Sequence, residues 1–320
     1  MGYLVRRLLQ TLPTIAAILV VTFVMVQLAP GDAVDALAGG GGDEASYDYL
    51  RSYLQLDRPL LEQFFSYAGH LLRGDLGISF VQGGRPVAEL IGERMPATLL
   101  LIGTALLIAG AGGLVLGSLA ARRPFGPFDM GISTTALIGY SLPAFWLAQL
   151  ALIALAFRAG LFPIQGMTEA RADYSGLAHY LDVGRHLVLP ALVLATSDLA
   201  LLTRVTRAGL IRELDRDYVR TAKGLGLRER DVVVRHALPN ALLPVVTVIG
   251  NRVGLLFTVT VIVETVFGWP GLGTLLLQAA QTRDRPLLLG MVLVVAAFVA
   301  LANLVTDMVY GWIDPRIRYD

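Results

Sequence analysis

The 320-residue sequence contains no cysteine, which excludes disulfide bonds, thiolate catalysis and thiolate metal sites. Charged residues are scarce, at 16% of the chain, whereas soluble domains carry about 25%. The four histidines, His70, His179, His186 and His236, show no metal-binding spacing such as HExxH. No GxxxxGK[ST] motif occurs, and the single lysine, Lys223, is not followed by Ser or Thr, so no ATP site is expected on this chain. A net charge of +1 offers no general attraction for nucleic acid.

Apolar residues are abundant, at 55% of the chain, and they gather in long runs. A helix that crosses a membrane needs about 20 mostly apolar residues. Six such runs follow one another: Leu8–Asp32, Ala97–Ala121, Met130–Phe157, Leu187–Thr203, Ala237–Val263 and Leu287–Thr306. Inside a bilayer each must be a helix, because no water is present to satisfy its backbone groups. The sequence therefore predicts an all-α polytopic membrane protein with six transmembrane helices.

The basic residues between these runs predict how the chain is oriented. The segment 31–96 holds five arginines and ten acidic residues, whereas the segment 204–236 holds nine basic and five acidic residues. Cytoplasmic loops are the ones enriched in Lys and Arg. We therefore expect both termini and the basic segment on the cytoplasmic side of the membrane, and residues 31–96 outside. The first apolar run is longer than the core of a signal peptide, so it is expected to remain as a helix.

The predicted division of the chain follows from these spans. Residues 1–30 form the cytoplasmic end and the first helix, and residues 31–96 form an extracytoplasmic insertion. Residues 97–315 form the core with a cytoplasmic loop at 204–240, and residues 316–320 form a cytoplasmic tail. Within the insertion, apolar residues over 60–68 have helical spacing, and the segment 74–80 predicts a turn that leads into a short strand. This insertion either only closes the outer mouth or also docks an external partner.

The cytoplasmic loop carries the most specific pattern in the sequence. It reads DYVRTAKGLGL over residues 217–227, and HALPN follows over 236–240. Gly224 and Gly226 are expected to end one short helix and to let another backbone approach closely. A second short helix is expected from Arg228, and Leu238–Pro239 is expected at the start of the fifth span, since proline is tolerated in a first turn. A plain basic loop facing anionic lipid is the alternative.

This loop resembles the EAA motif of ABC-importer permeases. Arg220-Thr221-Ala222 stands at the EAA position, Gly226 at the glycine of the motif and Leu238-Pro239 at its LP pair. Arginine in place of glutamate departs from the general motif but is the form seen in dipeptide/oligopeptide permeases. Further matching stretches occur in order along the chain: LAPGD at 28–32, LDRPL at 56–60, GDLG at 74–77, ERMPAT at 93–98, ETVFGWPGLG at 264–273 and DPR at 314–316.

The resemblance implies the type I ABC importer permease fold and the role of first permease subunit. It further implies a second homologous permease, two cytoplasmic ATPase subunits that bind ATP and Mg²⁺, and an external substrate-binding protein. No cofactor and no catalytic or metal-binding residue is implied on this chain. Peptides are the expected substrates, with nickel chelates and glutathione as alternatives. The residues implied in ATPase coupling are Tyr218, Arg220, Thr221, Ala222, Gly224, Gly226, Leu238 and Pro239.

Two opposite charges are expected deep in the membrane. Asp198 lies 12 residues beyond His186 and Arg252 lies 15 residues beyond Ala237, which places them roughly 18 and 22 Å from opposite surfaces. We expect them to pair; otherwise they contact substrate termini in the cavity or meet the second permease. An ion-coupled secondary transporter that uses these charges is the main rival function.

Three residues near the end of the fifth span are expected at the outer mouth of the pathway. They are Glu264, Trp269 and Pro270. Trp269 is either an interfacial side chain that follows a helix end or part of an outer constriction.

Overall fold

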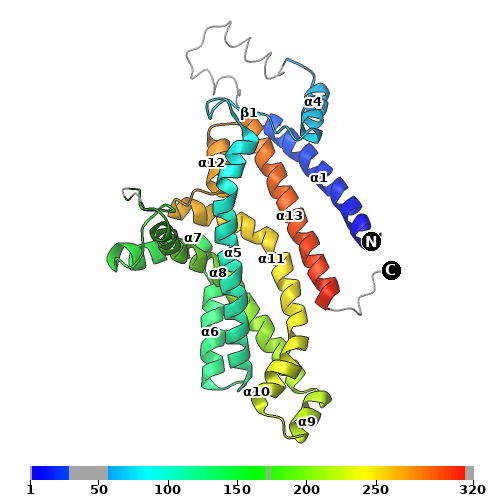
Figure 1. The fold of residues 1–320 in the computed structure, drawn as a ribbon, viewed down its shortest axis with the longest axis vertical. Coiled ribbons are helices and arrows are strands. Elements are labelled where there is room, and N and C mark those ends of the chain that lie inside the picture. Colours follow the sequence, from blue (N-terminus) through cyan, green and yellow to red (C-terminus); the bar gives the residue numbers. More distant parts are fainter. Residues whose placement is uncertain (1, 29–56, 171, 173, 314–320) are drawn as a thin grey trace. The chain divides into compact units, whose positions relative to one another are not determined.

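The computed structural model describes residues 2–28, 57–170, 172 and 174–313, which are mostly helical (Figure 1). The chain divides into two compact units, residues 1–97 with 271–300 and residues 98–270 with 301–320. By length and composition, four described helices are suited to cross a membrane, or up to six if each of two bent helix pairs is one crossing. The all-α membrane architecture predicted from the apolar runs is confirmed.

The first unit contains a helix and a small hairpin from the segment predicted to lie outside. Its elements are α1 (Gly2–Leu28), α4 (Leu60–Leu72), β1 (Ile78–Ser79), β2 (Arg85–Pro86), the start of α5 (Val87–Ala121), α12 (Leu272–Gln281) and most of α13 (Arg285–Ile313). The two strands pair antiparallel, with Ile78 opposite Pro86. The helix expected over 60–68 and the short strand after residue 74 are both present. Residues 31–56 of the insertion and the tail 316–320 lie outside the described residues.

Polar contacts fasten these elements to one another within the first unit. Asp284 caps α13, since its Oδ1 accepts the backbone N–H of Leu287 at 3.2 Å. The buried Ser79 hydroxyl donates to the other oxygen of Asp284, which ties the hairpin to the start of that helix. Helix α4 is held against α1 by the Gln27–Gln63 hydrogen bond of 2.6 Å.

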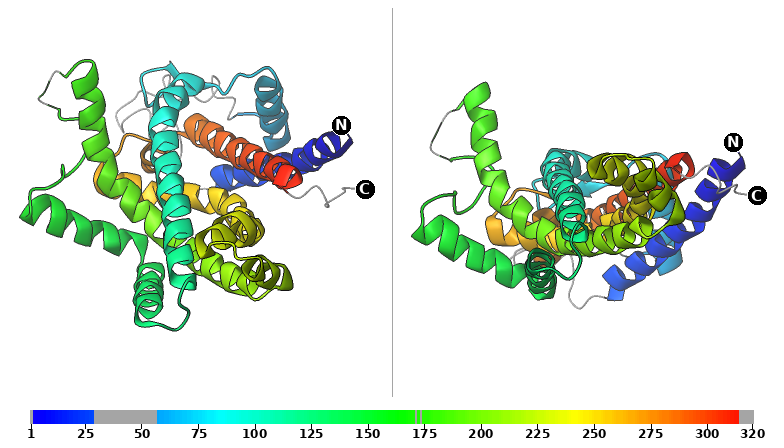
Figure 2. Two further views of the ribbon diagram at one scale, coloured as in Figure 1. Left: turned by 60° about the horizontal axis from the view of Figure 1, so that its bottom comes forward. Right: turned by 90° about the horizontal axis from the view of Figure 1, so that it is seen from below.

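The second unit holds the polar features that the sequence singles out. After α5 it comprises α6 (Pro127–Ser141), α7 (Ala144–Ala151), η1 (Leu152–Arg158), α8 (Leu177–Leu214), α9 (Asp217–Gly224), α10 (Glu229–Asp231), η2 (Val232–Ala237) and α11 (Leu238–Phe267). Helix α8 is its centre, because both α6 and α11 pack along it (Figure 2).

Small residues on α5 let it lie close to α8. A Cβ atom added at Gly113 would stand 2.6 Å from the Cβ of Leu202, and one added at Gly117 would stand 2.6 Å from the Cβ of Thr206. Apolar side chains gain little from leaving lipid for another helix, so membrane helices associate through close packing of this kind. The two glycines therefore fix the contact between α5 and α8.

The prediction of one continuous helix over Met130–Phe157 is wrong. Helix α6 ends at Ser141, and the following pair α7–η1 is turned by 105° from it. Leu142 and Pro143 adopt extended backbone angles at the break. Proline fixes its own φ, lacks an N–H and disfavours the helical conformation in the preceding residue. The run is uncharged on both sides of the break, so its composition alone does not predict the bend.

The fourth and fifth helices exceed their predicted bounds. Helix α8 has 38 residues, against a predicted span of Leu187–Thr203. The helix expected to begin at Arg228 is not a separate one, because α10 continues through the π-helical η2 into α11. These helices therefore extend beyond the apolar runs into flanking segments that contain charged residues.

Candidate functional site: the cytoplasmic segment and the intramembrane charges

Helix α9 is short, and it is anchored by its apolar face. Val219 and Ala222 are buried in a cluster with Leu210 of α8, Val232 and Val233 of η2 and further small residues, namely Ala121, Ala237 and Ala241. Their spacing of three residues places both on one side of the helix. The opposite side, with Arg220 and Thr221, is exposed. The segment is thus a short helix that is packed on its apolar side and exposed on its polar side.

Tyr218 connects α9 to both long helices of the unit. Its hydroxyl donates to Oε2 of Glu213 on α8 at 2.7 Å and accepts from Nδ2 of Asn240 on α11 at 3.1 Å. Partial burial raises the pKa of Tyr218, the bond from Asn240 lowers it, and the neighbouring Glu213 carboxylate raises it further. The hydroxyl therefore stays protonated at neutral pH and keeps its donor role.

Gly226 terminates α9 through a left-handed backbone conformation, with φ of +78°. The Leu227 N–H bonds the Ala222 carbonyl at 3.3 Å and the Gly226 N–H bonds the Lys223 carbonyl at 3.0 Å. This is the Schellman arrangement, in which glycine is favoured because a Cβ atom strains the backbone. Within the described part of this chain, a Cβ added at Gly224 or Gly226 meets no atom within 4 Å, so the close approach of another backbone to these glycines stays a prediction.

The other motif residues frame the segment. Leu238 and Pro239 follow η2 with no break in the helix, so the prediction that the fifth span begins at this pair is wrong. Arg220, whose side chain is 71% exposed, is 3.6 Å from the Asp217 carboxylate. An ion pair so exposed contributes little to stability. Arg220 therefore remains available to a partner.

Asp198 of α8 and Arg252 of α11 contact one another. Arg252 Nε donates to Asp198 Oδ1, the pairing that their matching depth predicts. The Asp198 side chain is 5% exposed and that of Arg252 is 25% exposed. Both border a cavity of about 170 Å³, which is otherwise lined mainly by apolar side chains and Ser197. No second hydrogen bond joins Arg252 to another described residue, so its terminal nitrogens retain free donors.

Two of the three residues expected at the outer mouth are buried. Trp269 is fully buried, so its interpretation as an interfacial side chain is wrong. Glu264 is also fully buried, and its Oε1 accepts a hydrogen bond of 2.6 Å from Thr98 of α5. Gly268 closes α11 in the left-handed conformation, and the Trp269 N–H returns to the Glu264 carbonyl at 2.8 Å. Pro270 is half-buried. Glu264 and Trp269 therefore pack inside the chain.

A second ion pair, between Asp129 and Arg207, was not predicted from the sequence. Asp129, in the first turn of α6, accepts from Arg207 Nη2 of α8 at 2.6 Å and from the backbone N–H of Phe125 at 2.7 Å. A carboxylate in a first helical turn is a recognisable signal, but its partner lies 78 residues away. Only the packing of α6 against α8 brings them together.

The part of the chain that the structure describes contains no group of three or more His, Asp or Glu residues that is able to hold a metal ion.

Comparison with known sequences gives matches over nearly the whole chain. Residues 113–319 match the family described as binding-protein-dependent transport system inner membrane component, and residues 1–102 match its N-terminal family. The oligopeptide transport system permease protein AppB of Bacillus subtilis is 37% identical over 99% of both chains. The dipeptide transport system permease protein DppB of Escherichia coli is 38% identical over 99% of this chain and 98% of its own. A putative peptide permease protein of Brucella suis is 42% identical over the same shares.

Comparison with solved structures gives the same architecture. A chain of the MetNI methionine ABC transporter in an inward-facing conformation matches with a TM-score of 0.56. The match covers 70% of this chain and 96% of that chain at 16% sequence identity. Likeness at this level of identity shows the fold alone, which is that of type I ABC importer permeases.

Proposed function

Because this chain belongs to the binding-protein-dependent transport system inner membrane component family, we propose that it forms half of a translocation pore and transmits the ATPase cycle to it through α9. The chain is a permease subunit of a peptide importer, as are its full-length relatives AppB and DppB by name. It is a multi-pass membrane protein. We place the basic α8–α11 segment and both termini in the cytoplasm, on the charge bias of the loops.

The observation that carries the coupling role is the construction of α9. This eight-residue helix has a buried apolar face, packed with residues of α8, η2 and α11, and an exposed polar face, and we expect it to move together with α8 and α11. Tyr218 strengthens this connection by bonding side chains of both helices. In this proposal, a displacement of α9 therefore also displaces α8, which carries Asp198, and α11, which carries Arg252. Arg220, Thr221 and the exposed Leu225 form the contact surface in this proposal.

The partners follow from the same proposal. Two ATPase subunits bind ATP and Mg²⁺ and dock on α9 and on its counterpart in a second permease. A binding protein delivers the peptide from outside. ATP favours the arrangement in which the ATPases are closed, and this differential binding shifts the pore between inward-open and outward-open states.

The Asp198–Arg252 cavity is the proposed part of the translocation path on this chain. A peptide carries a carboxylate at one end and an ammonium group at the other. The free donors of Arg252 suit the carboxylate, since guanidinium groups bind carboxylates through paired hydrogen bonds. A secondary transporter would instead use the pair as a proton or ion relay. The permease membership and the exposed α9 favour the ATP-driven function.

A cross-linking experiment tests the docking of α9. Because the chain has no native cysteine, a single Leu225→Cys change gives one reactive thiol, at a side chain that is 77% exposed. We expect a maleimide–benzophenone reagent, which attaches to this thiol and on illumination inserts into a C–H bond of a neighbouring chain, to join it to an ATPase subunit in the assembled complex. The matched control is Leu107→Cys on α5, which is 74% exposed and lies within a membrane span. Equal labelling from both positions, or none from residue 225, contradicts the proposal.

A further inference from the structure

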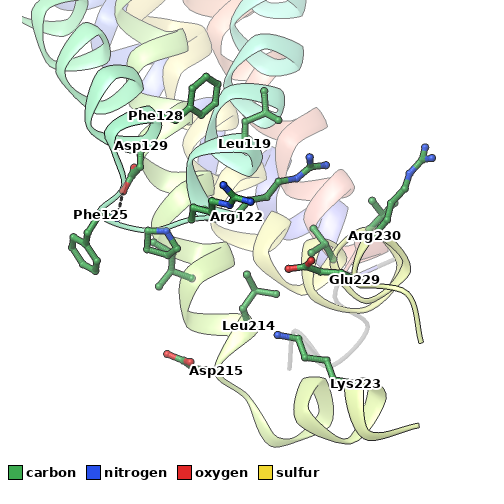
Figure 3. A pocket seen from close by; sticks show the side chains of 16 residues that line it. Leu119, Arg122, Phe125, Phe128, Asp129, Leu214, Asp215, Lys223, Glu229 and Arg230 are labelled. Atoms are coloured by element: carbon green, nitrogen blue, oxygen red, sulfur yellow. Dashed lines mark hydrogen bonds between the residues drawn. The ribbon is translucent and has the colours of Figure 1, made fainter. Parts of the chain in front are cut away.

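A pocket of about 910 Å³ lies beside α9 and is not explained by the transport cycle. Its walls come from the end of α5, the start of α6, the end of α8, α9 and the α10–η2 segment. In Figure 3, Arg122 enters it from the end of α5 and Lys223 from α9. The pocket thus joins the α5–α6 turn to the segment proposed to couple the ATPases.

Positive side chains outnumber negative ones at this pocket. Four cationic side chains line it: Arg122, Arg123, Lys223 and Arg230. The facing carboxylates are Asp129, Asp215 and Glu229, and Asp129 is already engaged by Arg207. Of the residues that the structure describes, none forms an ion pair with any of the four cations. Unpaired cations gathered around one pocket attract an anion with several oxygen acceptors, such as a phosphate group.

Apolar side chains stand exposed at the same pocket. Phe125 is 84% exposed and Phe128 is 63% exposed. Phe125 is held outward in a left-handed backbone conformation, with φ of +62°, by its N–H bond to Asp129. The Arg207 guanidinium also lies 5.8 Å from the centre of its ring. A free phosphate gains nothing from two exposed aromatic rings, whereas an acyl chain buries its surface against them.

We propose that this pocket binds an anionic glycerophospholipid. Arg122, Arg123 and Lys223 receive the headgroup phosphate, and the acyl chains run along Phe125 and Phe128. Basic pockets at the cytoplasmic ends of membrane helices suit anionic headgroups. On the orientation proposed above, the pocket faces the inner leaflet. The bound lipid bridges α9 to the α5–α6 turn, so the position of the coupling segment depends on lipid composition.

Native mass spectrometry of the full-length chain in detergent tests this site. After delipidation the chain is titrated with phosphatidylglycerol or with phosphatidylcholine. We expect one phosphatidylglycerol to bind in preference to phosphatidylcholine. The double change Arg122→Gln/Arg123→Gln removes two charges and is expected to weaken binding roughly 25-fold. The matched control Arg204→Gln/Arg212→Gln removes two exposed charges of α8 outside the pocket and is expected to leave binding unchanged.

Further variants separate the other outcomes. Arg122→Lys/Arg123→Lys keeps the charge and is expected to retain the lipid, which excludes misfolding as the cause of loss. Phe128→Gln is expected to weaken the lipid but not inorganic phosphate. If inorganic phosphate competes fully and Phe128→Gln has no effect, the site takes free phosphate and the lipid proposal is wrong. Equal loss in both double glutamine variants also overturns it. None of these readouts requires transport, so a failure of the coupling proposal leaves the lipid result interpretable.

Discussion

Replacing Gly226 with valine is expected to abolish substrate-stimulated ATPase activity of the reconstituted importer while the chain remains in the membrane. Gly226 has φ of +78°, and a left-handed conformation costs a residue with a Cβ about 1–2 kcal/mol, with β-branched residues the least tolerant. The strain is relieved by breaking the two hydrogen bonds that close α9. The last turn of α9 then loosens, and Ala222 leaves its buried position.

Two matched variants show whether conformation, rather than bulk, is the cause. Gly226→Asn is expected to retain most of the stimulation, because asparagine tolerates the left-handed conformation. Gly224→Ala is also expected to retain it, since Gly224 is helical and a Cβ there meets no atom within 4 Å. Stimulation of wild-type size in Gly226→Val, with normal complex assembly, would show that the end of α9 does not matter for coupling.

Breaking the Asp198–Arg252 pair from one side is expected to destabilise the purified chain by about 3–5 kcal/mol, because it leaves the partner charge buried and uncompensated. Asp198→Asn and Arg252→Gln should each show this loss as a lower thermal midpoint in detergent. The double variant has no charge left to bury and should recover much of it. Two residues in direct contact are expected to be non-additive in this way.

The exposed pair Arg85–Glu89 provides the control for that cycle. Its side chains are 39% and 51% exposed, so each single glutamine change should cost no more than about 1 kcal/mol. If the Asp198→Asn/Arg252→Gln variant is as unstable as the sum of its singles, the two charges do not stabilise one another. Each charge would then face the cavity and contact substrate independently of the other.

The sequence predicted those features that depend on short stretches of chain. Apolar runs located the helices, and the glycine at 226 marked the end of α9 because few other residues adopt its backbone conformation. The Asp198–Arg252 contact was predictable because both depths are measured along helices of fixed rise, from opposite membrane surfaces.

Features that depend on which helices are neighbours were not predictable. The bend at Leu142–Pro143 leaves hydropathy unchanged, and Pro143 is the one local signal of a break in the helix. Asp129 meets Arg207 only because α6 packs along α8. Glu264 lies in the last turn of α11 and Trp269 follows its end, which suggested exposure, yet burial depends on the surrounding helices. The roles of the motif residues in coupling and of the outer residues in transport stay predictions.

Uptake of a radiolabelled dipeptide into proteoliposomes tests the central claim most directly. The vesicles contain this chain, its partner permease and the ATPases, with the binding protein added outside. We predict that uptake requires ATP inside and the binding protein outside, and that it persists when ionophores collapse proton and sodium gradients. Uptake that an ion gradient drives without ATP would contradict the account and assign Asp198 and Arg252 to an ion-coupled transporter.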